Sequence, residues 1–181
     1  MSREIALKKI EQCKRDKIPY LDLSKMSLSK IPKEIKDLVW LQRLSISNNK
    51  IDDISILEYL PNIHKLALSN NLITNLSPLY SNKRLKFLFM KNNKIKDISP
   101  LKDLKTLKKI EANNNKIELI SPLSNLEKLV FLDLAYNNIK NINTLPKLKD
   151  LRWLSLKGNE ISLEEKISLT NTLPNLVYFA R

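Results

Sequence analysis

Apolar residues recur along most of the chain in a single frame, which predicts short strands at a fixed spacing. The frame reads L-x-x-L-x-L-x-x-N-x-I, and its first full copy runs from Leu41 to Ile51. The central x-L-x-L-x segment alternates polar and apolar positions, which is typical of a strand with one buried face. The apolar positions from Ile51 to Leu60, and their equivalents in later units, fall three residues apart and indicate a short 3-10 turn. Each unit therefore predicts one strand and one helical turn on the opposite side.

The spacing between units is constant. One asparagine occupies the same place in six consecutive units, 22 residues apart: Asn49, Asn71, Asn93, Asn115, Asn137 and Asn159. A variant unit precedes them, with Met26 where the asparagine belongs, and Leu176 and Phe179 continue the frame beyond them. A fixed period of this length predicts a solenoid in which each unit stacks on its neighbours.

The repeated asparagines predict a structural ladder. An asparagine that faces inward where the chain leaves a strand must pair its amide, and backbone groups of neighbouring units are the partners within reach. A buried group left unpaired would cost about 1–3 kcal/mol. We therefore interpret these six residues as structural rather than catalytic.

The phrase Ser-Pro-Leu opens the predicted turn in three units, at Ser77, Ser99 and Ser121. Serine is a favoured N-cap residue, and proline is favoured at the first helical position. The phrase therefore predicts that serine caps each of these turns.

A solenoid has two raw ends, and each needs a cover because it would otherwise expose apolar surface and an unpaired strand edge. Residues 1–17 predict an N-terminal capping helix with Ala6, Leu7, Ile10 and Cys13 on one face. Residues 18–162 hold about seven units, and residues 163–181 predict a C-terminal cap of one helix and one strand. We expect Cys13 to be a small buried apolar residue.

The frame resembles the leucine-rich repeat. This resemblance implies an α/β right-handed solenoid, with a curved parallel sheet on the concave face and short 3-10 or helical segments on the convex face. The last residues, from Lys157 to Arg181, resemble the C-terminal cap of the short intracellular class, which includes a regulator of protein phosphatase 1. The phrase D-I-S-P-L from Asp97 to Leu101 is similar to the repeats of bacterial internalins. Internalins also have a secretion signal and an immunoglobulin-like domain, and we expect neither here, so the cap favours the intracellular class while the repeats leave the bacterial one open.

The charge of the chain raises the question of an anionic partner. Lysine and arginine number 32 against 19 aspartates and glutamates, which gives a formal net charge of +13. Such an excess raises the question of nucleic acid or an anionic membrane, but a lysine- and asparagine-rich composition on solvated faces is the favoured explanation. The chain has no apolar run long enough for a membrane helix and no secretory signal, and its single cysteine cannot form an internal disulfide. We expect a cytoplasmic monomer that does not bind membranes, with an unconventional secretion route left open.

Candidate catalytic groups are sparse. The single glycine, Gly158, argues against glycine-rich phosphate loops. The single histidine, His64, which we expect at a solvated rim, is far from Cys13 in sequence, so neither a metal cluster nor a nucleophile–base pair is indicated. We expect a protein that is not an enzyme and that uses no cofactor and no metal.

Binding residues are expected on the outward side of the strands. Alternation sends large aromatic and charged side chains to this concave face, where exposed aromatic clusters usually mark interaction sites. The predicted partner-binding residues are Phe87, Phe89, Lys91, Lys109, Glu111, Phe131, Asp133, Tyr136, Trp153 and Tyr178. The alternative to a binding role is that some of these rings pack into grooves between strands.

The sequence therefore favours a scaffold that binds a protein partner on its concave face. An RNA or ribonucleoprotein adaptor is the first alternative, because lysines are interleaved with aromatic residues, although Glu111 and Asp133 on the same face argue against nucleic acid. An internalin-like bacterial protein that binds host proteins is the second.

Overall fold

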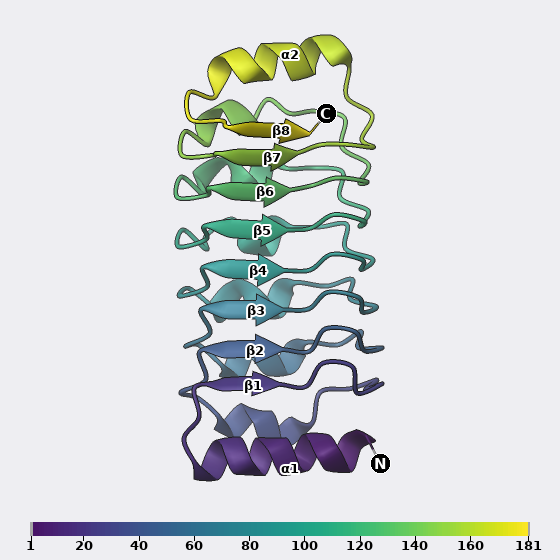
Figure 1. The fold of residues 1–181 in the computed structure, drawn as a ribbon, viewed down its shortest axis with the longest axis vertical. Helices are drawn as coiled ribbons and strands as arrows, with labels where there is room; N and C mark the ends of the chain where they lie inside the picture. Colours follow the sequence, from purple (N-terminus) through teal and green to yellow (C-terminus); the bar gives the residue numbers. More distant parts are fainter. Residues whose placement is uncertain (1, 181) are drawn as a thin grey trace.

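The structure is a computed structural model that describes residues 2–180. Eight parallel strands form one open sheet in chain order (Figure 1). The strands are Tyr20–Asp22 (β1), Arg43–Ser45 (β2), Lys65–Ala67 (β3), Phe87–Phe89 (β4), Lys109–Glu111 (β5), Phe131–Asp133 (β6), Trp153–Ser155 (β7) and Tyr178–Ala180 (β8). Neighbouring strands pair so that equivalent positions of successive units lie side by side, for example Leu66 beside Leu88. The predicted α/β solenoid with one strand per unit is confirmed.

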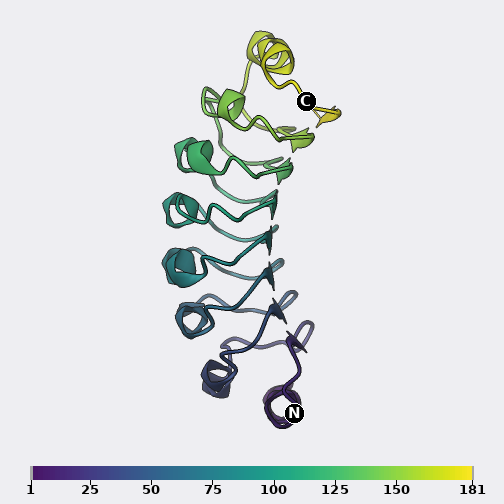
Figure 2. The ribbon, with the colours of Figure 1, turned by 90° about the vertical axis from the view of Figure 1, so that its left-hand side faces the viewer.

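Short 3-10 segments form the other side of the solenoid. They are Lys33–Asp37 (η1), Ser55–Tyr59 (η2), Ser77–Ser81 (η3), Ser99–Leu101 (η4), Ser121–Asn125 (η5) and Leu145–Lys147 (η6). Figure 2 shows the strands in one column and these segments in a second column, and the strand column bends slightly at its ends. The outward face of the sheet lies on the inside of this bend, and we call it the concave face.

The prediction that serine caps these turns is wrong. In the units with Ser-Pro-Leu, the serine is the first residue of the 3-10 segment and its side chain makes no capping hydrogen bond. In two of these units, the residue two positions earlier performs this role. Asp97 Oδ1 accepts from the Ser99 N–H at 2.8 Å, and Asn75 Oδ1 accepts from the Ser77 N–H at 2.8 Å. Aspartate and asparagine side chains readily accept from the backbone two residues on, so they supply the local start of the turn.

The interior repeats unit by unit, with one exception. Leu41, Leu44 and Ile46 are at most 2% exposed, and their equivalents in the next five units are also buried, while Leu176 and Phe179 at the end of the sheet are half-buried. The last apolar column before the next strand holds Leu38, Leu60, Leu104, Leu126 and Leu148, but Asn82 stands in this column at 1% exposure. The Asn82 Nδ2 donates to the Leu60 carbonyl at 2.7 Å, while its Oδ1 has no partner within residues 2–180. The expectation that this column is apolar in every unit is therefore wrong at Asn82.

The repeated asparagines join each unit to the one before it. Asn93 Nδ2 donates to the carbonyls of Met90 and Leu68, both at 3.1 Å, and its Oδ1 accepts from the Ile73 N–H at 3.0 Å. Asn71, Asn115 and Asn137 make the same three bonds, and Asn159 also bonds in this way at the end of the row. In the first unit, the backbone N–H groups of Met26 and Leu28 donate to Asn49 Oδ1. The variant unit is therefore bonded to the asparagine of the next unit, although it has no asparagine of its own at this position.

The residue before each ladder asparagine also has a structural reason, which the sequence analysis did not supply. Asn48, Asn70, Asn92 and Asn114 all have left-handed backbones, with φ between 54° and 58°. Asparagine enters this region more readily than most residues because its short polar side chain bonds locally. The two later units place Tyr136 (φ 53°) and Gly158 (φ 72°) at the same point.

Helices cover both ends of the sheet (Figure 1). Helix α1, Ser2–Arg15, buries Ala6, Ile10 and Cys13 against the first unit. Helix α2, Leu163–Thr172, begins at a capping box between Ser162 and Glu165 and precedes β8. Within residues 2–180, no helix combines the length and apolarity required to cross a bilayer.

Candidate functional site

The concave face consists of the first and third residues of each strand, because the middle residue of each interior strand is buried. Eight of the ten predicted binding residues occupy such positions in β4, β5, β6, β7 and β8. Lys91 and Tyr136 lie just beyond β4 and β6, at the edge of the face. Phe87, Lys91, Tyr136 and Tyr178 are exposed, and the other six are half-buried.

Three rings on the last strands form a continuous stack, which we call the aromatic stack: Phe131, Trp153 and Tyr178. The ring centroids of Phe131 and Trp153 lie 4.0 Å apart with planes at 6°, and those of Trp153 and Tyr178 lie 5.1 Å apart at 11°. The strand register produces the stack, since the three residues are direct neighbours across β6, β7 and β8. The ring faces that meet between neighbouring strands therefore cover one another, while Tyr178, on the last strand, stays exposed.

Lysines occupy the faces of the adjacent rings. Lys109 Nζ lies 3.8 Å from the Phe131 ring centroid and 2.9 Å from Glu111 Oε1. Lys65 Nζ and Lys109 Nζ lie 5.3 Å and 5.5 Å from the Phe89 ring centroid. These distances are within the range of cation–π attraction. Lysine ammonium groups on β3 and β5 therefore contact aromatic rings on the neighbouring strands β4 and β6.

Two carboxylates stand side by side in the middle of the face. Glu111 and Asp133 are register partners on β5 and β6. Burial raises the pKa of Asp133 above its ordinary value, and the negative charge of Glu111 raises this pKa further. The Ala135 N–H donates to Asp133 Oδ1 at 3.1 Å and lowers the same pKa, but by less than burial raises it. Among the described residues Asp133 has no basic side chain within salt-bridge distance, whereas Glu111 is paired with Lys109. The centre of the face therefore carries one unpaired negative charge.

A hollow of about 350 Å³ lies over β3 and β4, and we call it the basic hollow. It exists because Ala67, a small residue, stands beside the large ring of Phe89 in the strand register. Its lining consists of Ser47, Asn48, Lys65, Ala67, Ser69, Asn70, Phe89, Lys91 and Glu111. The predicted site contained Phe89, Lys91 and Glu111 but not Lys65, Ala67 or the asparagine row. The signal that could have revealed the hollow is the alanine between Ser45 and Phe89 in that column of the sequence.

Tyr136 is the strained residue at the edge of the face. Its left-handed φ of 53° is one that a bulky aromatic residue rarely adopts. Its ring lies directly over Gly158 of the next unit, where an added Cβ would come within 2.5 Å of Tyr136 Cδ1. The only glycine of the chain therefore makes room for the one aromatic residue in this left-handed row.

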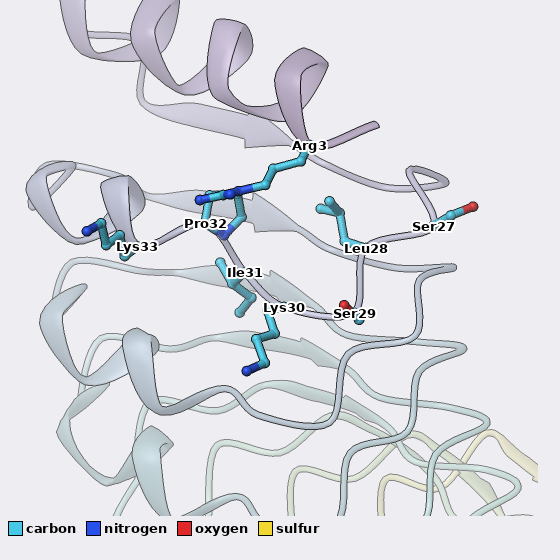
Figure 3. Close-up of a pocket in the computed structure, with 8 residues that line it drawn as sticks. All are labelled: Arg3, Ser27, Leu28, Ser29, Lys30, Ile31, Pro32 and Lys33. Atoms are coloured by element: carbon cyan, nitrogen blue, oxygen red, sulfur yellow. The ribbon is translucent and has the colours of Figure 1, made fainter. Parts of the chain in front are cut away.

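A second hollow, of about 500 Å³, lies near the N-terminus between α1 and η1. It is lined by Arg3, Ser27, Leu28, Ser29, Lys30, Ile31, Pro32 and Lys33. Figure 3 shows Arg3 lying across Pro32, while Lys30, Lys33 and Ser27 point apart from one another. Since these polar groups do not converge, the hollow does not form an anion site.

The titratable groups considered for catalysis lie apart from one another. Cys13 is buried on the inner face of α1, and burial raises the pKa of its thiol, which disfavours the reactive thiolate. His64 is half-buried just before β3, and its pKa is lowered by burial and then by the charges of Lys86 and Arg84. Within residues 2–180 no three histidine, cysteine, aspartate or glutamate side chains are grouped closely enough to hold a metal ion.

The sequence and the fold were compared with known proteins. A model of the family described as "Leucine Rich repeats (2 copies)" matches residues 61–103. No curated protein matches the sequence. Among solved structures, internalin InlF of Listeria monocytogenes is 26% identical with a TM-score of 0.82, and the match covers 94% of this chain and 56% of InlF.

Two further structures have similar folds. Internalin C2 of Listeria monocytogenes is 28% identical with a TM-score of 0.80, and the match covers 93% of this chain and 83% of internalin C2. A leucine-rich-repeat protein of Leptospira interrogans, 23% identical with a TM-score of 0.81, supports the fold alone; the match covers 93% of this chain and 50% of that protein. The chain thus spans little more than half the length of InlF. These relatives are leucine-rich-repeat proteins, a class that commonly serves as protein-interaction modules and is typically non-enzymatic.

Proposed function

The chain is a leucine-rich-repeat solenoid whose repeats resemble those of internalins, and from this premise we propose that it is a non-enzymatic scaffold that binds a protein partner on its concave face. The observation that carries the proposal is the contrast between the two sides of each strand. The buried side repeats the same apolar residues, whereas the concave side changes from one strand to the next and collects exposed rings and charges. Exposed aromatic residues of this kind are typical anchors of protein interfaces.

The contacts of the rings favour protein over nucleic acid as the partner. A nucleobase binds an aromatic side chain by stacking on an open ring face. In the aromatic stack the inner faces cover one another, and on Phe131 and Phe89 lysine ammonium groups lie over the rings. Ring edges are well suited to apolar side chains, while the unpaired charge of Asp133 repels phosphate.

The cellular setting is a separate proposal. The similarity to InlF and internalin C2 favours a bacterial protein of internalin type over the short intracellular class. The same concave face serves as the binding surface in either setting. A cytoplasmic location stays a prediction that rests on the single cysteine.

The proposal is tested by capture with paired variants. The double variant Phe89→Ala/Trp153→Ala removes two concave rings, and Tyr59→Ala/Tyr80→Ala removes two exposed rings from the 3-10 segments on the convex side. We expect the concave variant to lose partners that the wild-type chain and the convex variant both retain, with about 2–4 kcal/mol lost per buried anchor. Partners lost only by the convex variant would overturn the proposal, and thermal melting of both variants checks that each is folded.

A further inference from the structure

The concave face has two unlike halves that together define the chemistry of a partner segment. The basic hollow lies over β3 and β4, and the aromatic stack lies over β6, β7 and β8. Between them stand the Lys109–Glu111 ion pair and Asp133. A partner that contacts both halves must therefore present different groups at its two ends.

The basic hollow is suited to an anionic group. Within residues 2–180 neither Lys65 nor Lys91 has a carboxylate within salt-bridge distance, and the remaining charged wall, Glu111, is already paired with Lys109 at 2.9 Å. Neutral donors add to the two ammonium groups. Asn70 Nδ2 donates to Asn48 Oδ1 at 2.8 Å, which leaves the Asn48 amide N–H groups without a partner among the described residues. The hollow thus combines two positive charges that have no carboxylate partner with an open amide donor, a combination that favours a carboxylate.

The aromatic stack is suited to a large apolar side chain. Tyr178 is 49% exposed, and Phe131 and Trp153 are half-buried with their inner faces covered. An apolar group laid across the open ring edges would cover surface that the stack itself leaves wet. Asp133, next to the stack and without an ion-pair partner, disfavours a carboxylate there. The two halves therefore select opposite properties, and an acidic group is directed to the hollow.

The separation of the halves sets the spacing of these groups. Strands in a sheet lie about 4.8 Å apart, so the centre of the hollow, between β3 and β4, is roughly 17 Å from the middle of the stack at β7. The hollow also lies nearer the carboxyl ends of the strands than the stack does, which lengthens the path slightly. A chain laid across the strands in extended form covers it in about six residues, at roughly 3.3 Å per residue, and side chains an even number of positions apart point to the same face.

We propose that the partner presents an extended acidic segment across the strands, with a carboxylate side chain in the basic hollow and a large apolar side chain about six residues away on the aromatic stack. This inference rests on the proposed function, since it assumes that the concave face binds protein. It adds the chemistry and the spacing of the recognised segment.

Synthetic peptides test the spacing directly on the full chain. Three labelled probes of about twelve residues carry a glutamate pair and a tryptophan, adjacent in the first, roughly six positions apart in the second and roughly ten in the third. A fourth probe has the six-position spacing with lysines in place of the glutamates. We expect the second probe to bind about tenfold more tightly than the other three by fluorescence anisotropy, and its affinity to fall between about 50 mM and about 300 mM sodium chloride.

Matched variants locate the binding. Lys65→Gln/Lys91→Gln removes the two charges of the hollow, and Lys94→Gln/Lys116→Gln removes two exposed charges that do not line it. The first pair is expected to weaken the second probe about tenfold and the control pair less than about twofold. Equal losses in both pairs would mean that net charge rather than the hollow attracts the peptide, which overturns the proposal.

Three further results would also overturn it. They are equal affinity for the glutamate and lysine probes, absence of binding by every probe at about 1 mM, and tighter binding of an oligouridine through the same two lysines. The first two leave the proposed function standing if capture still depends on Phe89 and Trp153. Loss of capture in the convex variant alone would instead remove the proposed function itself.

Discussion

The two sides of each strand contrast sharply, although they belong to the same three residues. On the buried side, equivalent positions are filled by the same kind of residue in nearly every unit, because each side chain packs against copies of itself in the units before and after. On the concave side the first residues of β3, β4 and β5 are lysine, phenylalanine and lysine, and no packing constraint makes them alike. A residue that differs from its equivalents in other units is therefore expected to lower stability on the buried side, whereas on the concave side it is a candidate for contact with a partner.

The largest expected effect comes from removing the last cover of the buried side. Deletion of residues 163–181 removes α2 and β8 and exposes Leu151, Leu154 and Leu156 of the final unit, together with the open edge of β7. We expect aggregation or fraying, observable by light scattering and circular dichroism. A monomeric truncated chain with an undiminished signal per residue would show that the C-terminal segment is not a cap.

The next effect concerns the asparagine ladder. Asn93→Ala removes four hydrogen bonds to backbone groups of two units, so we expect a loss of about 1–3 kcal/mol in the free energy of unfolding. Lys94→Ala, one residue on and exposed, is the control and should change stability by less than about 0.5 kcal/mol. Equal denaturation midpoints for the two variants would refute the structural role of the ladder.

The single polar residue in the buried leucine column gives a change of opposite sign. Asn82→Leu restores the residue found at Leu60 and Leu104 and removes a carbonyl oxygen that has no partner within residues 2–180, so stability should rise by about 1–2 kcal/mol. The reverse change, Leu104→Asn, serves as the matched comparison and should be destabilising in the same urea titration. A loss of stability in Asn82→Leu would mean that the site cannot accept the larger side chain.

The smallest expected effect lies at the edge of the concave face. Tyr136→Asn places in the left-handed row the residue that Asn92 and Asn114 supply in earlier units, and we expect a gain of up to about 1 kcal/mol from relief of backbone strain. Affinity for a captured partner should fall at the same time, because the ring over Gly158 is lost. If the variant were both less stable and equally active in capture, Tyr136 would be a packing residue and not a contact.

The sequence by itself determined the architecture, since the constant period, the apolar frame and the repeated asparagine each describe one local unit that can only bury its apolar side by stacking. It also placed the strands and identified which side chains face outward, because alternation along a strand is a local property. The tertiary structure decided how outward side chains from different units meet. The stacking of Phe131, Trp153 and Tyr178, the lysines over Phe89, the hollow over Ala67 and the fit of Tyr136 on Gly158 all depend on neighbours a full repeat apart. Contacts of this kind follow from strand register and rotamer choice across units, which no pattern within a single repeat specifies.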